Sequence, residues 1–161
     1  MSFSSYFTHK PGGDRIFSVE APKIKFGRGS LQEVGDDAKA LGMKRVAVFT
    51  DPRVGKMEHV AKVVESMKSQ GMDAVVYDQV AVEPTDISFK QGAEFASKGK
   101  FDGFVSVGGG SVMDTCKAAN LYSCYPADFL DYVNAPIGKA IPVPGELKPH
   151  IACPTTFGTA S

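Results

Sequence analysis

Apolar and polar positions alternate between two periods from residue 22 onward. Short, nearly uninterrupted apolar runs, typical of strands covered on both faces, occupy residues 24–26, 45–50, 74–77, 103–107 and 151–153. Apolar residues recur at helical spacing over residues 30–41, 54–70, 86–98 and 111–122. Strands that alternate with helices of this length predict βαβ units with right-handed crossovers. We therefore expect an α/β fold, with a Rossmann-like parallel sheet and helices on both faces.

The ends of these segments carry local signals. We expect Ser30 to cap the first helix and Gly42 to end it, and Asp86 to start the third. A short helix is predicted over residues 129–132, followed by a proline-rich loop over residues 134–149.

The 161 residues have room for one domain with a sizeable core. We expect residues 22–161 to form it. Residues 1–21 are predicted to be a loose arm, because they lack the apolar core of a secretory signal and have few arginines for a transit peptide.

The composition limits the classes of partner and of binding site that we expect. The 18 basic residues balance 18 acidic ones, so no global field favours nucleic acid or an anionic membrane. No apolar run approaches the length of a membrane-spanning helix.

The three cysteines are odd in number and show no Cys-x-x-Cys spacing, which indicates a reducing compartment. We expect Cys116 to be a small apolar side chain packed in the core. The three histidines are scattered, and we expect no metal site within this sequence.

The most informative segment joins a strand to a helix through Gly108, Gly109 and Gly110. Glycines can adopt positive φ angles and let backbone N–H groups approach a bulky anion. The helix expected to begin near Ser111 would point its unpaired N–H groups and the positive end of its dipole at the same place. This pattern predicts a phosphate cradle, although a simple strand-to-helix turn also uses glycine.

Other polar residues follow the strands at the same predicted edge. Asp51 could accept the hydroxyl hydrogens of an adenosine ribose, or merely cap the following turn. Asp114 could favour the helix dipole, and Lys117 could be an ordinary surface lysine. The segment 154–159 supplies three threonine hydroxyls, which could equally belong to a turn.

Taken in order, these motifs resemble the N-terminal domain of the iron-containing alcohol dehydrogenase family. The matching segments are Phe26-Gly27-x-Gly29, Thr50-Asp51, Pro84-Thr85, Gly108 to Ala118, and Pro154 to Thr159. Three further segments resemble the hydroxyacid–oxoacid transhydrogenase branch, namely residues 83–86, 113–122 and 128–133.

The resemblance implies that NAD lies across the sheet edge. Asp51 would hold the adenosine ribose, and the pyrophosphate would lie on Gly109, Gly110 and Ser111. The phosphates or the nicotinamide side would contact three threonines, Thr155, Thr156 and Thr159. Asp114 and Lys117 match motif positions whose role stays open.

The resemblance also implies the reaction. A tightly held NAD would take hydride from 4-hydroxybutyrate or a similar hydroxyacid and pass it to 2-oxoglutarate, giving succinic semialdehyde and 2-hydroxyglutarate. Iron or another divalent metal would polarise the substrate oxygen. Its ligands, an aspartate and three histidines, would belong to a helical second domain that is expected to be absent from this chain. The chain is then expected to bind NAD and to be inactive alone.

Several alternatives remain open at this point. The chain could be a non-catalytic NAD-binding module, or a fragment of a metal-dependent alcohol dehydrogenase. The expected partners are small hydroxyacids and oxoacids, with no nucleic acid and no membrane, and with either a homo-oligomer or a missing C-terminal domain. The resemblance implies the mitochondrial matrix, and the poor presequence leaves the cytoplasm as the alternative.

Overall fold

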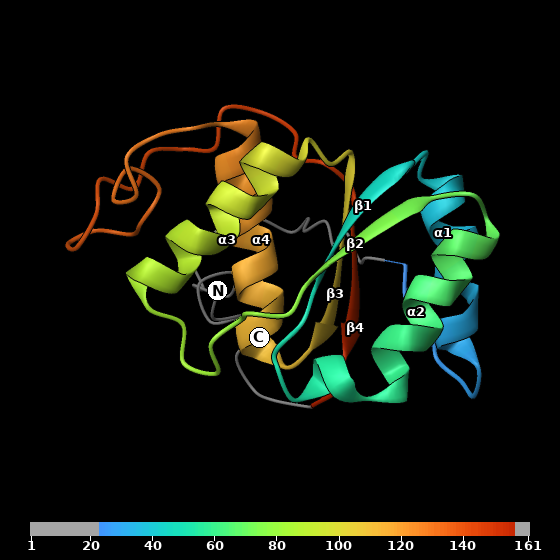
Figure 1. Cartoon of the computed structure of the whole chain (residues 1–161). Helices are drawn as coiled ribbons and strands as arrows, with labels where there is room; N and C mark the ends of the chain where they lie inside the picture. The colour runs from blue at the N-terminus through green and yellow to red at the C-terminus, as the bar shows by residue number, and fades with distance from the viewer. Residues whose placement is uncertain (1–22, 157–161) are drawn as a thin grey trace, which may run out of the picture.

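The computed structural model describes residues 23–156 and shows a four-stranded parallel sheet between two pairs of helices (Figure 1). The strands are β1 (Arg45–Phe49), β2 (Asp73–Tyr77), β3 (Gly103–Gly108) and β4 (His150–Pro154). The α-helices are α1 (Val34–Ala40), α2 (Glu58–Ser69), α3 (Asp86–Gly99) and α4 (Gly110–Cys124). Short 3-10 helices, Ser30–Glu33 and Val54–Lys56, lie before α1 and α2. The predicted α/β fold with helices on both faces is confirmed.

The strand order explains where a ligand can bind. Neighbouring strands follow the order β2-β1-β3-β4, and every pair is parallel. The chain runs outward from β1 to β2 and then returns past β1 to β3 through α3. Helices α1 and α2 cover one face of the sheet, and α3 and α4 cover the other (Figure 1). The direction of winding therefore reverses between β1 and β3, and ligands of such sheets bind outside the carboxyl ends at this switch point.

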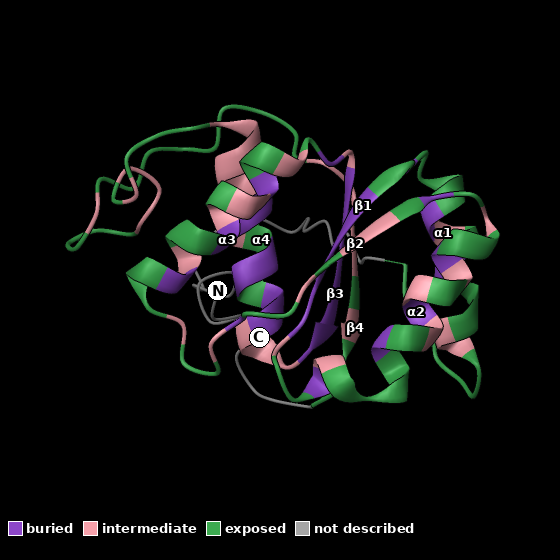
Figure 2. Cartoon of the chain, in the orientation of Figure 1, coloured by how far each residue is buried: buried purple, intermediate pink, exposed green. Residues whose placement is uncertain are grey.

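The hydrophobic core fills both sides of the sheet, as the buried strand and helix faces in Figure 2 show. The α1 and α2 side is packed mainly by aliphatic side chains and methionines, among them Val46, Val48, Val63, Met67 and Val105. The α3 and α4 side is more aromatic and includes Phe49, Phe101, Phe104, Val112 and Cys116. Among residues 23–156, no helix combines the length and the apolar character needed to cross a bilayer.

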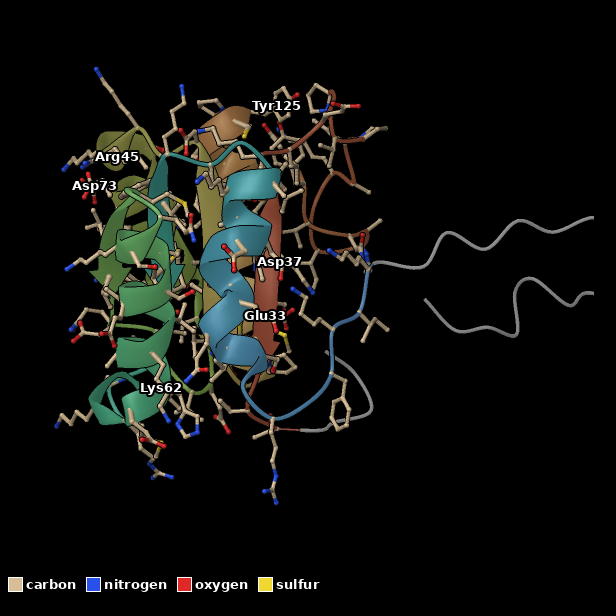
Figure 3. The ribbon with its side chains drawn as sticks, turned by 90° about the vertical axis from the view of Figure 1, so that its right-hand side faces the viewer. Glu33, Asp37, Arg45, Lys62, Asp73 and Tyr125 are labelled. Atoms are coloured by element: carbon tan, nitrogen blue, oxygen red, sulfur yellow. The ribbon has the colours of Figure 1, made fainter. Side chains whose placement is uncertain are left out.

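An ion pair and two hydrogen bonds connect the amino ends of the strands. Arg45 pairs with Asp73, and Figure 3 shows both at one end of the molecule, with Lys62 at the other. Oδ1 of Asp102 accepts hydrogen bonds of 2.9 Å from the backbone N–H groups of Lys44 and Arg45. These contacts satisfy polar groups at the amino edge of the sheet, opposite the edge where the predicted site residues lie.

The predicted strand over residues 24–26 is wrong. This segment forms no strand, and Ile24 and Phe26 are 80% and 93% exposed. A strand needs a neighbour to accept its ladder hydrogen bonds, and none pairs with it among the residues that the structure describes. Lys25 instead holds the segment beside α1 through ion pairs with Glu33 at 2.8 Å and Asp37 at 2.6 Å.

Two helix predictions also need correction. The residue at the N-cap of the first 3-10 helix is Gly29, with φ of 88°, and no side chain caps it, so Ser30 is not the predicted cap. Residues 129–132 form turns and no helix. The Phe129 carbonyl accepts a hydrogen bond from the Tyr122 hydroxyl at 2.5 Å, and the Tyr132 hydroxyl donates to the Tyr125 carbonyl at 3.2 Å, so tyrosine side chains join this segment to the end of α4.

The third helix begins as predicted at Asp86, with Thr85 as its cap. The strands over 74–77, 103–107 and 151–153 are confirmed with one or two residues added.

Candidate functional site

The predicted site residues lie at the carboxyl edge, around the β1 and β3 switch point. Asp51 follows β1, the glycine turn 108–110 joins β3 to α4, and Thr155 and Thr156 follow β4. Thr159 lies outside the described residues. The register pairs Gly108 with Pro154, so the glycine turn and the threonines leave neighbouring strands at the same level.

The glycine turn and the threonine segment are in contact. The backbone N–H of Thr155 donates to the Gly108 carbonyl at 2.9 Å, which continues the β3–β4 pairing past the strand ends. A Cβ atom added to Gly109 would lie 3.0 Å from Oγ1 of Thr156. Any larger side chain at Gly109 would therefore crowd the space in front of the turn. The structure thus brings together residues that the sequence separates by almost 50 positions.

The glycines do not adopt positive φ angles, which corrects one of the two reasons expected for them. Gly109 has φ of −81° and ψ of −172°, an extended conformation that other residues can adopt. None of the three residues 108–110 has positive φ. Gly108 is instead required by packing, because a Cβ there would lie 2.5 Å from a methyl group of Val112. The absence of this Cβ lets α4 start directly against the end of β3.

The amino terminus of α4 is suited to an anion. The helix begins at Gly110, one residue before the predicted start, and Gly109 is its N-cap. The Gly109 carbonyl accepts from the N–H groups of Val112 and Met113 at 3.0 and 3.1 Å. The N–H groups of Gly110 and Ser111 precede these bonds and belong to the donors that a helix leaves unused at its start. With the positive end of the helix dipole, they lie at the carboxyl edge of the sheet, where β3 ends and α4 begins.

The charge pattern of the helices supports this assignment. The first turn of α1, α2 and α3 carries the acidic residues Asp36, Asp37, Glu58 and Asp86. Carboxylates at this position stabilise a helix through its dipole. The first turn of α4 has no acidic residue and no side-chain cap. The positive end of this dipole is thus available to a bound anion.

Asp51 adopts the capping geometry that was one of its two predicted roles. Its Oδ1 accepts from the backbone N–H groups of Arg53 at 2.8 Å and Val54 at 2.9 Å. The preceding Thr50 is fully buried, and its hydroxyl donates to the Val107 carbonyl at 2.8 Å, which ties the ends of β1 and β3 together. The cap uses one carboxylate oxygen, so it is compatible with a ribose contact through the other.

Ser111, Asp114 and Lys117 differ in their surroundings. The Ser111 hydroxyl donates to the Val82 carbonyl in the connection between β2 and α3. Asp114 and Lys117 are exposed on α4 and lie 3.6 Å apart as an ion pair. The structure therefore places Ser111 at the glycine turn and shows Asp114 in a surface pair with Lys117.

Sequence reasoning missed a polar pair beneath this edge. Ser106 is fully buried in β3, and its Oγ lies 2.9 Å from Nε2 of His150 in β4. Burial, assisted by the positive charge of Lys117, lowers the pKa of His150 to about 4. The imidazole is consequently neutral near pH 7 and belongs to the packed sheet. One signal in the sequence could have indicated this pair. Side chains alternate between the two faces of a strand, so Ser106 lies on the same face of β3 as Phe104, and Phe104 pairs with His150 in the register of β3 and β4.

The predicted packing role of Cys116 is confirmed. The residue is fully buried in the aromatic half of the core. Burial raises the pKa of its thiol far above the ordinary value, which makes it unsuitable as a nucleophile.

The candidate site is an open edge and not an enclosed cavity. Two surface hollows of about 320 and 330 Å³ lie elsewhere. The first is lined by the segment 27–32, which precedes α1, and by Lys62, and the second lies between α3 and the segment after α4. Within residues 23–156, no three histidine, cysteine, aspartate or glutamate side chains cluster so that they could hold a metal ion.

Comparison with known proteins agrees with this fold. The family model "Iron-containing alcohol dehydrogenase" matches residues 21–161. The chain is 52% identical over 149 residues to the mitochondrial hydroxyacid–oxoacid transhydrogenase of Bos taurus, covering 92% of this chain and 32% of the relative. It therefore spans about a third of the length of this curated relative.

Two solved structures show the same arrangement. A 1,3-propanediol oxidoreductase superposes with a TM-score of 0.78 at 28% identity, over 91% of this chain and 37% of the other. The sulfoacetaldehyde reductase of Bifidobacterium kashiwanohense, solved in complex with NAD+, has a TM-score of 0.78 at 26% identity, over 91% of this chain and 38% of the other. Because the family model covers all of the described residues 23–156, the chain belongs to the iron-containing alcohol dehydrogenase family.

Proposed function

We propose that this chain is the NAD-binding part of a hydroxyacid–oxoacid transhydrogenase. The observation that carries the proposal is the glycine turn at the switch point, with unused N–H groups and without acidic side chains in the first turn of α4. The choice of branch depends on similarity. The transhydrogenase of Bos taurus is 52% identical, whereas the propanediol oxidoreductase is 28% identical over a similar share of this chain. This difference favours a transhydrogenase over an ordinary alcohol dehydrogenase.

The residues at this edge fit a nicotinamide dinucleotide. A diphosphate needs several N–H donors and a close approach to the backbone. The start of α4 offers the N–H groups of Gly110 and Ser111, and Gly109 has no Cβ atom, which would narrow the space beside Thr156. We assign the diphosphate to Gly109, Gly110 and Ser111, and the adenosine ribose to Asp51. The carboxylate of Asp51 would also repel the additional phosphate of NADP.

The remaining cofactor assignments are made on the same edge. Thr155 and Thr156 follow β4 beside the glycine turn and are proposed to contact the phosphates or the nicotinamide side. Thr159 and Asp114 are proposed as further cofactor residues on motif position alone.

In the proposed reaction a hydride passes from 4-hydroxybutyrate or a similar hydroxyacid to 2-oxoglutarate, and the products are succinic semialdehyde and 2-hydroxyglutarate. NAD supplies the hydride carrier when bound, and this chain's own residues bind and orient it. We also propose that the 161 residues do not turn these substrates over by themselves. The metal ligands implied for the family are not matched within residues 23–156. By likeness to the mitochondrial relatives, we propose a mitochondrial location.

Calorimetric titration of the chain with NAD tests the binding assignment. We expect saturable one-site binding that Gly109→Val abolishes. The backbone conformation of Gly109 is open to valine, so the variant should fold, while its side chain fills the space in front of the turn. Ala127→Val places the same isopropyl side chain at an exposed loop position and serves as the control. Equal affinity in Gly109→Val and the control would remove the diphosphate from this turn.

Turnover is tested separately, with 4-hydroxybutyrate, 2-oxoglutarate, NAD and Fe²⁺. NAD binding without product supports the proposal for the isolated chain. Robust formation of 2-hydroxyglutarate would contradict the proposed need for further metal ligands. Selective oxidation of simple alcohols would instead favour the alcohol dehydrogenase alternative.

A further inference from the structure

The connection between β2 and α3 crosses the carboxyl edge and reaches the start of α4. Its first anchor is Val80, which is 1% exposed and donates its N–H to the Thr50 carbonyl at 3.3 Å. Its last anchor is Thr85, whose side chain and backbone exchange hydrogen bonds with Ser88 in a capping box. Between these anchors lie residues 81–84, at the mouth of the proposed diphosphate site.

Ser111 is the link between this short segment and the glycine turn. Its hydroxyl donates to the Val82 carbonyl, and this is the one hydrogen bond to residues 81–84 recorded within the described range 23–156. The Val82 side chain is 76% exposed, so core packing does little to hold it. Ala81 and Pro84 at the ends of the segment are half-buried, so the Ser111 hydroxyl is the contact that holds its exposed middle, Val82 and Glu83.

A serine hydroxyl has a single proton to donate, so it serves one acceptor at a time. In the proposed complex, a diphosphate lies at the start of α4, within the neighbourhood of Ser111. A hydrogen bond to an ionised phosphate is roughly twice as strong as a bond to a neutral carbonyl. The Val82 carbonyl oxygen carries a partial negative charge. It would lie close to the bound diphosphate, because both groups would be next to the Ser111 hydroxyl, and the two would repel each other.

We propose that the Ser111 hydroxyl exchanges hydrogen-bond acceptors, from the Val82 carbonyl in the free protein to the diphosphate in the complex. Binding then releases residues 81–84 from the start of α4. The inference rests on the proposed function, since it takes the diphosphate to bind at this turn. It adds that occupancy of the site controls the mobility of the segment that leads into α3.

Backbone order parameters of Ala81, Val82 and Glu83, measured by NMR with and without saturating NAD, test this exchange. We expect values near 0.85 in the free protein and a fall below about 0.6 on addition of NAD. Ser111→Ala should show the low values without NAD and no further fall with it. Ser111→Thr, which keeps the hydroxyl, should restore the wild-type pattern. Ser97→Ala removes a hydroxyl that bonds only within α3, and should leave the segment unchanged.

The outcomes separate the two proposals. If NAD binds while the order parameters of residues 81–83 stay constant or rise, the exchange is wrong and the cofactor assignment stands. If Ser111→Ala leaves the free segment as rigid as in the wild type, the exchange is also wrong. If NAD fails to bind at all, the proposed function and the exchange fail together.

Discussion

Protonation of His150 should make this domain sensitive to mild acid. His150 is half-buried on β4, and its Nε2 lies 2.9 Å from Oγ of the buried Ser106 in β3. Burial and the positive charge of Lys117 lower its pKa to about 4. In the unfolded chain the ordinary value of 6.5 applies. Between these two values the unfolded state binds a proton that the folded state does not, so acid shifts the equilibrium toward unfolding.

The size of this effect follows from the difference between the two pKa values. The interval from 6.5 to about 4, at about 1.4 kcal/mol per pH unit, gives a loss of about 3 kcal/mol below pH 4. The loss begins as the pH falls through 6.5 and is complete once it has passed about 4. A loss of this size is a large part of the total stability of an ordinary domain, which is about 5–15 kcal/mol.

Urea unfolding at a series of pH values from 7 to 4 measures this loss. We expect His150→Leu to flatten the decline of the unfolding free energy by about 3 kcal/mol across the series, whatever its offset at pH 7. Lys117→Gln should flatten it in part, because its charge is the smaller cause. His59→Leu, at an exposed position on α2, should keep the wild-type slope. Parallel curves for wild type and His150→Leu would refute the reasoning.

Three further predictions follow from the site and the core. Asp51→Asn retains an oxygen that can accept from the N–H groups of Arg53 and Val54, so we expect unchanged stability but a preference for NAD over NADP reduced by about tenfold; an unchanged ratio in calorimetric titrations would leave Asp51 as a cap alone. Gly108→Ala should lower the unfolding free energy by about 1–3 kcal/mol, since its Cβ would lie 2.5 Å from Val112; a neutral result in urea unfolding would contradict the packing explanation. Cys116 should resist alkylation by iodoacetamide in the folded protein and react in urea; rapid labelling in the native state, seen by mass spectrometry, would show that it is accessible.

The parts of the fold that depend on local pattern could be predicted from the sequence. The apolar run over Val46 to Phe49 is buried on both faces, so its residue types alone identify a central strand. The glycine turn could also be placed, because it follows one such strand directly. Its conformation could not, since the need for glycine at position 108 comes from Val112 in three dimensions and not from a backbone angle.

The features that sequence reasoning missed depend on long-range pairing. Residues 24–26 have the composition of a strand, yet a strand forms only where another strand offers its edge. The contact between Ser106 and His150 depends on the register of β3 and β4, which joins residues 44 positions apart. The bond from Ser111 to Val82 likewise required the path of the β2–α3 connection across the sheet edge.

The most direct test of the central claim is a crystal structure of the chain soaked with excess NAD. We predict that the diphosphate accepts hydrogen bonds from the N–H groups of Gly110 and Ser111, with the adenosine ribose at Asp51. A dinucleotide bound elsewhere, or a glycine turn without density for a ligand at saturating NAD, would contradict the account.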